Sequence, residues 1–322
     1  MARVSLLMAV YNGEKYIEEA IESILSQTYQ DIELIICDDG STDGTKEILS
    51  AYRTNPKVKC IFAEHRGKVA AFNTAFTSAT GEAITLVACD DVLAHQSIER
   101  RIQHLITGKE AVYHNGYICD KELNIIGEMN MNPSTLSWDP HWLPMVRNNL
   151  LSGSLMLFSK SVADKIFPVP EELRFEDWWI NFFVLFYATK IEYIDENLFY
   201  YRQHGANACG ALQGSSSNSI LMNDWKRHPQ FYSTLYSAVK GLHHSIPQNR
   251  EVLDAIENNH ELVARTILRK FTFPNPNILK YAGIRKYILS QLMVLHLSGF
   301  ACDSYYYVQK TKKQWRKILG GM

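Results

Sequence analysis

The chain has 322 residues, of which 46% are hydrophobic, and a formal net charge of −1. This length and composition allow a sizeable core and argue against wholesale disorder. The charge is uneven, because residues 220–322 carry 15 Lys and Arg against 6 Asp and Glu, whereas residues 1–219 carry 18 against 28. The basic part could meet an anionic surface or could be a solvated helical face, and we expect no nucleic-acid partner.

The six cysteines are scattered along the chain and form no CxxC pair. A zinc knuckle or a redox dithiol is therefore not expected, and a reduced, cytoplasmic setting fits best. The first residues enter a strand-like segment and do not resemble a signal peptide. No stretch reaches the roughly 18 uncharged apolar residues that span a bilayer, so we expect any membrane contact to be peripheral.

Apolar runs alternate with segments of helical periodicity in the first part of the chain. Four strands are predicted here, over residues 4–12, 32–40, 58–64 and 83–91. Four helices follow them in turn, over residues 14–27, 41–53, 68–79 and 97–106. Nearly continuous apolar strands that are separated by helices predict an α/β fold with a doubly wound, mainly parallel sheet.

The later part of the chain changes in character. A strand pair, a long loop with three prolines, a strand, two helices and a last strand are predicted, over residues 111–128, 129–149, 150–159, 161–167, 175–188 and 190–195. A small-residue linker at 214–219 precedes three predicted helices and a basic tail, over residues 220–243, 250–270, 277–298 and 310–317. We therefore divide the chain into an α/β domain of residues 1–213 and a basic helical region of residues 214–322.

Polar and aromatic side chains gather where three of the predicted strands end. These residues are Ala9, Tyr11 and Asn12 after the first strand, Asp38 and Asp39 after the second, and Asp90 and Asp91 after the fourth. Ligands of a doubly wound sheet bind beyond the carboxyl ends of its strands. An Asp-Gly-Ser after one strand is usually only a turn and helix cap, but three strand ends agree here. An aromatic face and nearby carboxylates are what a nucleotide pocket requires.

No glycine-rich phosphate loop follows the first strand, because neither GxxxxGK[ST] nor GxGxxG is present. A bound diphosphate would therefore need a metal ion or basic side chains. Asp90 and Asp91 are neighbours on an extended segment, so their side chains point to opposite faces. Carboxylates suit hard cations such as Mg²⁺ or Mn²⁺. The alternative is that Asp91 caps the helix that follows.

Taken together, these segments resemble the inverting glycosyltransferases of family 2, which have the Rossmann-like GT-A fold. The resemblance covers about residues 3–205 and rests on ordered motifs: VSLLMAVYNGEKYIEEAIESILSQTYQDIELIICDDGSTDGT, GKVAAFN, ACDD, GSLMLFSKSV, FEDWW and YRQHGAN. It implies transfer of a sugar from a nucleotide-diphosphate sugar, and Asp39 with Tyr11 favours UDP or dTDP as the carrier, because uracil and thymine both present a ring N–H. Many members carry a further acidic residue at the position of Ala88, which this chain lacks.

The resemblance also implies roles for residues of the donor site. In this interpretation Ala9 and Tyr11 frame the base, Asp39 accepts the ring N–H with support from Asp38, Lys68 and Asn73 approach the donor, and Asp90 meets the ribose or metal region. Asp91 would bind Mn²⁺ or Mg²⁺. His204 would touch the diphosphate or complete the metal shell, and Arg202 would neutralise phosphate charge.

The catalytic pair implied by the resemblance is Glu176 and Asp177. Asp177 would be the general base that removes the acceptor hydroxyl proton, with Glu176 as its positioning partner. Carboxylates are also favourable at a helix N-terminus, so simple capping is the alternative. The acceptor side would include Gly153 and Ser154, and also Trp178 and Trp179, for which core packing is an equally good explanation.

The remaining expectations concern partners and competing functions. The acceptor would be a glycan or a polyprenyl-diphosphate-linked glycan in surface polysaccharide assembly. The basic region at 214–322 would touch a membrane or form a homodimer. Two other functions are alternatives. One is a sugar nucleotidyltransferase, which would require a Gly-rich basic loop after the first strand. The other is a non-catalytic nucleotide-sugar-binding or scaffold protein.

Overall fold

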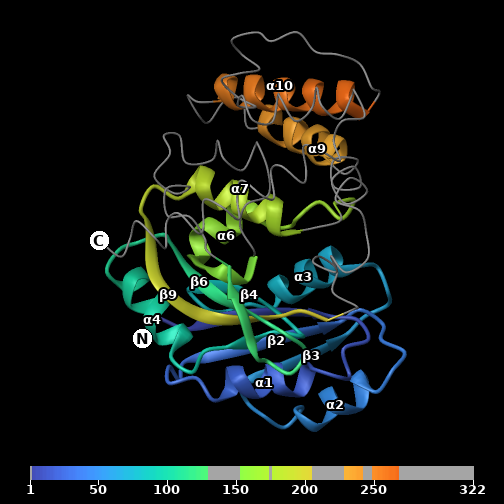
Figure 1. The fold of residues 1–322 in the computed structure, drawn as a ribbon, viewed down its shortest axis with the longest axis vertical. Coiled ribbons are helices and arrows are strands. Elements are labelled where there is room, and N and C mark those ends of the chain that lie inside the picture. The colour runs from blue at the N-terminus through green and yellow to red at the C-terminus, as the bar shows by residue number, and fades with distance from the viewer. Residues whose placement is uncertain (1, 130–152, 174–175, 205–227, 242–248, 268–322) are drawn as a thin grey trace. The chain divides into compact units, whose positions relative to one another are not determined.

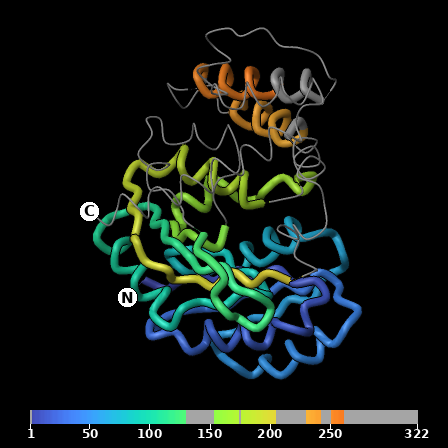
Figure 2. The backbone as a smooth tube through the Cα atoms, in the orientation of Figure 1, coloured from blue at the N-terminus to red at the C-terminus, as the bar shows by residue number. Residues whose placement is uncertain are grey.

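The structure is a computed structural model that describes residues 2–129, 153–173, 176–204, 228–241 and 249–267 (Figures 1 and 2). The chain divides into two compact units, Met1–Ala211 and Leu212–Met322. In the second unit the described elements are two helices, α9 (His228–Gly241) and α10 (Asn249–Ile267). The predicted linker, the third predicted C-terminal helix and the basic tail lie outside the described residues, as does most of the proline-containing loop.

The first unit is built on one nine-stranded sheet, with strand order β3-β2-β1-β4-β8-β6-β9-β5 and with β7 paired to β6. Its strands are β1 (Val4–Val10), β2 (Ile32–Asp38), β3 (Val58–Phe62), β4 (Ala83–Ala88), β5 (Val92–Leu93), β6 (Ala111–Cys119), β7 (Ile125–Glu128), β8 (Met156–Ser159) and β9 (Ile191–Arg202). Strands β3, β2, β1 and β4 are parallel to one another, whereas β8 runs antiparallel to both of its neighbours. The predicted doubly wound, mainly parallel sheet is confirmed.

Helices cover both faces of this sheet, as Figure 1 shows, with α1 and α2 on one face and α3, α6 and α7 on the other. The bounds are α1 (Ile17–Leu25), α2 (Thr45–Ala51), α3 (Lys68–Thr77), α4 (Ser97–Ile106), α6 (Lys160–Ile166) and α7 (Glu176–Tyr187), with a short 3₁₀ turn η2 (Gly153–Leu155). Alternate side chains of β1 (Leu6, Met8 and Val10) pack with Ile17 and Ile21 of α1 in one buried cluster. None of the described helices is long and apolar enough to cross a membrane.

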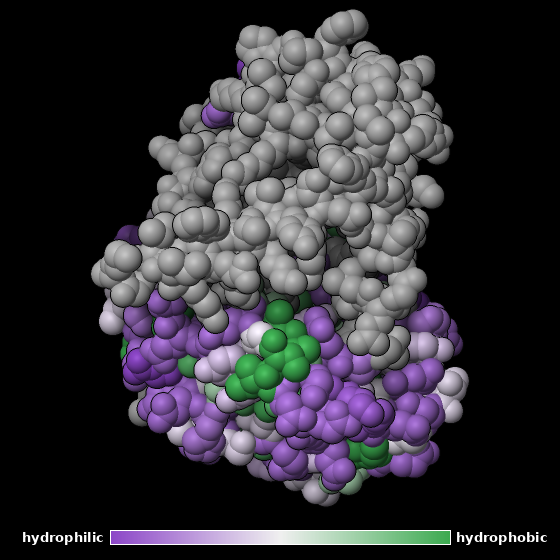
Figure 3. Space-filling model, in the orientation of Figure 1, coloured by the Kyte–Doolittle hydropathy of each residue, from purple (hydrophilic) through white to green (hydrophobic). Residues whose placement is uncertain are grey.

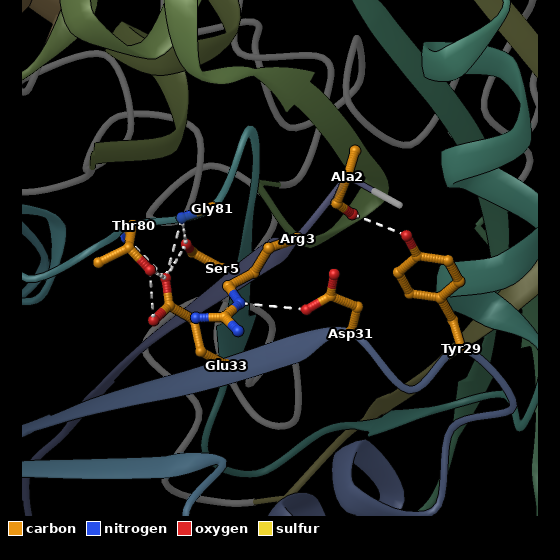
Figure 4. A network of polar contacts seen from close by, with 8 residues as sticks. All are labelled: Ala2, Arg3, Ser5, Tyr29, Asp31, Glu33, Thr80 and Gly81. Carbon is orange, nitrogen blue, oxygen red and sulfur yellow. Dashed lines mark hydrogen bonds and ion pairs between the residues drawn. The ribbon is translucent and has the colours of Figure 1, made fainter.

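The amino-terminal edge of the parallel strands is closed by internal hydrogen bonds (Figure 4). The carboxylate of Glu33 accepts bonds from the Ser5 hydroxyl at 2.6 Å, the Thr80 backbone N–H at 2.6 Å and the Gly81 N–H at 3.0 Å. Burial raises the pKa of Glu33, but these bonds outweigh burial and lower the pKa overall. A side chain at Gly81 would lie 2.7 Å from the carbonyl oxygen of Arg3, so only glycine fits there. This edge therefore stabilises the fold, and the opposite edge is available for ligands.

The segment after β4 differs from the sequence prediction. Asp91 is followed by the short strand β5, which the sequence does not predict, and α4 begins at Ser97 as predicted, with Gln96 at its N-cap position. Asp91 is therefore not a helix cap. β9 extends to Arg202, although the predicted strand ends at residue 195, because its second half pairs with β5 and β6.

The described surface is mostly hydrophilic, with small apolar patches on the face seen in Figure 3. Large exposed hydrophobic side chains among the described residues are Tyr11, Ile106, Ile125 and Ile126. Tyr11 is 48% exposed and lies at the carboxyl end of β1. An exposed aromatic ring at this edge is what a base-binding site would use.

Candidate functional site

The loops that follow β1 and β2 are joined by backbone-to-side-chain hydrogen bonds. The N–H of Asn12 donates to Ser41 Oγ at 2.9 Å, and Asn12 Oδ1 accepts the Thr42 N–H at 2.8 Å. Asn12 has a φ of 53°, a left-handed conformation that Asn tolerates better than most residues. The N–H of Gly13 donates to Thr45 Oγ1 at 2.9 Å. These bonds fix the backbone that presents the neighbouring Tyr11.

Asp38 has a supporting role within these loops. Its side chain is fully buried, and Oδ1 accepts the N–H of Ser41 at 3.2 Å. This bond makes the turn that the Asp-Gly-Ser sequence predicts. Asp38 therefore holds the turn that follows Asp39, and its predicted support of Asp39 stays a prediction.

Asp39 organises the turn that leads into α3. Its Oδ1 accepts the backbone N–H of Arg66 at 2.8 Å, and its Oδ2 accepts the N–H of Gly67 at 2.9 Å. Gly67 has a φ of 103°, which favours glycine. His65 Nδ1 also lies 2.9 Å from Oδ2, and the His65 ring packs on Tyr11 with a centroid distance of 4.3 Å. Tyr11, Asp39 and His65 therefore form one contiguous unit.

Sequence reasoning does not identify His65. Nothing in its local pattern marks it, because its contact to Asp39 spans 26 positions of the chain. Ala9 is buried at 8% exposure and pairs with Cys37 and Ala88 in the sheet, so it forms the floor beside Tyr11.

The predicted catalytic pair lies next to this unit through α3. Lys68 directly follows Gly67, and its Nζ lies 2.8 Å from Oε1 of Glu176 at the first residue of α7. Glu176 is 4% exposed, and the carboxylate of Asp177 accepts the Trp178 N–H at 2.8 Å. Carboxylates in the first helical turn are also favoured by the helix dipole, so capping contributes as well.

The 3₁₀ turn η2 backs this helix start. A Cβ added at Gly153 would lie 3.5 Å from Cβ of Asp177, an ordinary van der Waals contact, so this turn lies directly beside the start of α7. Ser154 is 7% exposed within the same turn. Gly153 therefore lies beside the predicted base, and the acceptor-side role of Gly153 and Ser154 stays a prediction.

A second group forms around Asp90 and His204. Nε2 of His204 lies 3.0 Å from Oδ2 of Asp90, and the His204 ring packs on Tyr16 with a centroid distance of 4.8 Å. A pocket of about 310 Å³ opens beside this pair, lined by Asn12, Gly13, Glu14, Lys15, Tyr16, Asp43 and His204. Tyr16 is a further residue that sequence reasoning does not single out.

Residues 89 and 90 form a turn after β4, so the extended segment predicted here ends at Ala88, and Asp90 and Asp91 make separate contacts. Asp91 is 6% exposed, and its Oδ1 accepts the backbone N–H of Arg202 at 2.8 Å. Burial raises the pKa of Asp91 well above its usual value, repulsion from Asp90 raises it further, and the bond from Arg202 opposes both. Asp91 is thus the more enclosed carboxylate of the pair.

The residues present fit a divalent cation in part. The carboxylate of Asp90 and the imidazole of His204 are both metal-ligand types, and His204 lines the pocket. Within the described ranges, however, no three His, Cys, Asp or Glu side chains converge on one point. A cation here would therefore need further ligands, such as the oxygens of a diphosphate.

Two predicted donor contacts have a different role in the structure. Arg202 is 3% exposed, and its guanidinium donates to the carbonyls of Asp90 at 2.8 Å and Lys121 at 2.7 Å and to Glu19 at 2.5 Å. The predicted phosphate contact is therefore corrected, because this guanidinium ties β9 to the rest of the fold. Asn73 donates to the carbonyl of Val169 at 2.7 Å and accepts its N–H at 2.8 Å, so both ends of its amide hold the backbone after α6.

The two tryptophans of α7 are core residues. Trp178 is 7% exposed and Trp179 is 5% exposed. The indole of Trp179 donates to the Ile166 carbonyl at 3.3 Å, and its ring packs on Phe183. Both tryptophans therefore pack in the core, which was the alternative considered for them. Their predicted stacking on an acceptor sugar is not supported.

Comparison with known proteins agrees with this arrangement. A crystal structure of TarS from S. aureus in complex with UDP-GlcNAc superposes with a TM-score of 0.60 at 17% identity, covering 97% of this chain and 92% of that one. The fold of the first unit is therefore the GT-A fold. The sequence profile described as "Glycosyl transferase family 2" matches residues 5–167, about half of the chain. The chain belongs to this family.

Relatives found by sequence share more identity with this chain. An uncharacterized glycosyltransferase of Nostoc sp. is 31% identical over 215 residues, covering 64% of this chain and 66% of that protein. The Escherichia coli protein WfaP, named UDP-Glc:alpha-D-GlcNAc-diphosphoundecaprenol beta-1,3-glucosyltransferase, is 28% identical over 75% of this chain and 95% of its own length.

Proposed function

We propose that this chain is an inverting glycosyltransferase that uses a UDP- or dTDP-sugar and a hydroxyl of a glycan or lipid-linked glycan. The observation that carries the proposal is a continuous series of contacts along the carboxyl edge of the sheet. It runs from Tyr11 and Asp39 through Gly67 and Lys68 to the start of α7. This series supports a base-binding unit and a general base that belong to one site.

The base would stack on Tyr11 and donate a ring N–H to Asp39. Each carboxylate oxygen can accept about two hydrogen bonds. Among the described residues, the one donor on Oδ1 of Asp39 is the Arg66 N–H, whereas Oδ2 has Gly67 and His65. One acceptor position on Oδ1 therefore remains, and this matches uracil or thymine, which offers a single ring N–H.

Asp177 would act as general base. It would take the proton of the acceptor hydroxyl while that oxygen forms a bond to the anomeric carbon and the bond to the diphosphate oxygen breaks. A single displacement of this kind inverts the anomeric centre. Glu176, held by Lys68, would keep the start of α7 in place.

Asp90 and His204, with Asp91 behind them, would hold a Mn²⁺ or Mg²⁺ ion together with the donor diphosphate. When bound, such an ion supplies positive charge that stabilises the leaving nucleoside diphosphate. The absence of a phosphate-binding glycine loop, and the engagement of Arg202 elsewhere, favour this assignment.

The acceptor is proposed by likeness to relatives. The E. coli relative is named for a diphosphoundecaprenol-linked acceptor, and we propose an acceptor of this class, used in surface polysaccharide assembly at the cytoplasmic face of the membrane. The basic region at 214–322 would then provide a peripheral membrane contact, or a dimer interface.

The test is a thermal-shift screen of UDP- and dTDP-sugars with Mn²⁺, followed by hydrolysis and transfer assays with and without EDTA. We expect Asp177→Asn to bind the donor normally but to lose transfer by about 10²–10⁴-fold. Asp195→Asn, an exposed carboxylate on β9, is the matched control and should keep the parent rate. Full transfer by Asp177→Asn would contradict the base assignment, and no stabilisation by any nucleotide-sugar would contradict the function.

A further inference from the structure

His65 has a contact that the proposed reaction does not use. Its side chain is 58% exposed, yet Nδ1 lies 2.9 Å from Oδ2 and 3.0 Å from the carbonyl oxygen of Asp39. Both of these atoms are acceptors, so Nδ1 must carry the hydrogen. The ring also packs on Tyr11. An exposed histidine is therefore held in one orientation at the entrance to the base-binding unit.

The consequence for Asp39 is a carboxylate with unequal oxygens. Oδ2 accepts the N–H of Gly67, and Nδ1 of His65, whose single hydrogen is shared with the Asp39 carbonyl oxygen, lies 2.9 Å from Oδ2 and occupies its second acceptor position. Oδ1 accepts one, from Arg66. Since the backbone donors belong to the turn that begins α3, the donor that a side-chain substitution can remove is the imidazole of His65.

We infer that His65 is a specificity-determining residue that makes the site select a base with one ring N–H donor over guanine. Guanine presents two adjacent donors, its ring N–H and its exocyclic amino group, and a carboxylate receives them best with both oxygens open. In this chain the second donor would face an oxygen that His65 already occupies. A donor left without an acceptor in a binding site weakens binding, so guanine is disfavoured.

This role of His65 rests on the proposed nucleotide site at Tyr11 and Asp39, and it adds selection between bases to the proposed function. If it holds, removing the imidazole N–H leaves each carboxylate oxygen with one backbone donor and one open position. The carboxylate then becomes a two-point acceptor suited to guanine. Binding of uracil, which needs only the Oδ1 position, should change little.

Two substitutions separate the hydrogen bond from the ring contact. His65→Phe keeps an aromatic ring over Tyr11 but has no N–H. His65→Asn places an amide nitrogen near the position of Nδ1, so it can keep the hydrogen bond while losing the ring. His65→Ala removes both and is the second test of the missing donor, should the Phe variant fail to fold.

The experiment measures the dissociation constants of UDP and GDP in the presence of Mn²⁺ by titration calorimetry, with thermal melting to establish that each variant is folded. The parent and His65→Asn should bind UDP at least about tenfold more tightly than GDP. His65→Phe and His65→Ala should narrow this ratio by about tenfold, through tighter GDP binding.

The outcomes distinguish the two levels of the proposal. A parent that binds UDP tightly, with Phe and Ala variants that keep the full preference, would overturn the role of His65 and leave the nucleotide site intact. Loss of preference in His65→Asn would overturn it too, because the ring contact would then be responsible. A parent that binds neither nucleotide would overturn the proposed function together with this inference, and a parent that prefers GDP would overturn the inference directly.

Discussion

Removing Lys68 from its ion pair with Glu176 should lower the free energy of unfolding more than removing the charge of Glu176 does. Glu176 is 4% exposed, its Oε1 lies 2.8 Å from Nζ of Lys68, and its Oε2 is buried without a hydrogen-bond partner among the described residues. Lys68, in contrast, has a side chain that is 43% exposed. Removing Lys68 leaves a buried carboxylate, whereas removing the charge of Glu176 leaves an amine that water can reach.

The magnitudes follow from this asymmetry. Breaking a fully buried pair by removing one partner costs about 3–5 kcal/mol, and partial exposure of Lys68 reduces this. We expect Lys68→Met to lower the free energy of unfolding by about 1–3 kcal/mol. Glu176→Gln keeps an acceptor and should cost no more than about 1 kcal/mol.

Urea denaturation of the parent, both single variants and the double variant measures these values. In the Glu176→Gln background, Lys68→Met should cost much less than it does in the parent, because no buried charge is left behind. Equal costs for the two single variants, or a Lys68→Met cost that is unchanged in the Glu176→Gln background, would refute this reasoning.

Two further predictions address residues that were expected to touch the donor and that the structure places elsewhere. Arg202→Met should lower the free energy of unfolding by about 3–5 kcal/mol, because a buried, fully engaged guanidinium is lost; Arg66→Met, which removes an exposed pair with Glu171, should cost less than about 1 kcal/mol in the same urea titration. Asn73→Ala should cost about 1–3 kcal/mol through the two lost bonds to Val169 while changing the UDP dissociation constant less than twofold. A stable Arg202→Met that binds donor poorly, or an Asn73→Ala with impaired UDP binding and normal stability, would restore the donor-contact roles.

Much of the first unit was predictable because its signals are local. The apolar runs from Val4 and from Ile32 are buried on both faces, and such runs read as strands of a parallel sheet. The helix at Ser97–Ile106 has the predicted bounds. Elements were misjudged where pairing decides them: β5 is two residues long, and β9 extends because it has partners along its whole length.

The site was predictable in its residue types but not in its contacts. Asp38, Asp39, Asp90 and Asp91 all lie at strand ends, as their positions indicate. Sequence alone does not say that Asp91 is the enclosed member of its pair, since that depends on the return of β9 past it, 111 positions later.

The alternation of strands and helices, and therefore the edge at which ligands would bind, follows from local sequence patterns. Those properties depend on residues that are near one another in the chain. Which polar groups remain available at that edge depends on the folded chain, because hydrogen bonds between distant segments occupy donors and acceptors. Folding engages Arg202 and Asn73 in hydrogen bonds to main-chain carbonyls and pairs Lys68 with Glu176. It also brings Nδ1 of His65 to 2.9 Å from Oδ2 of Asp39.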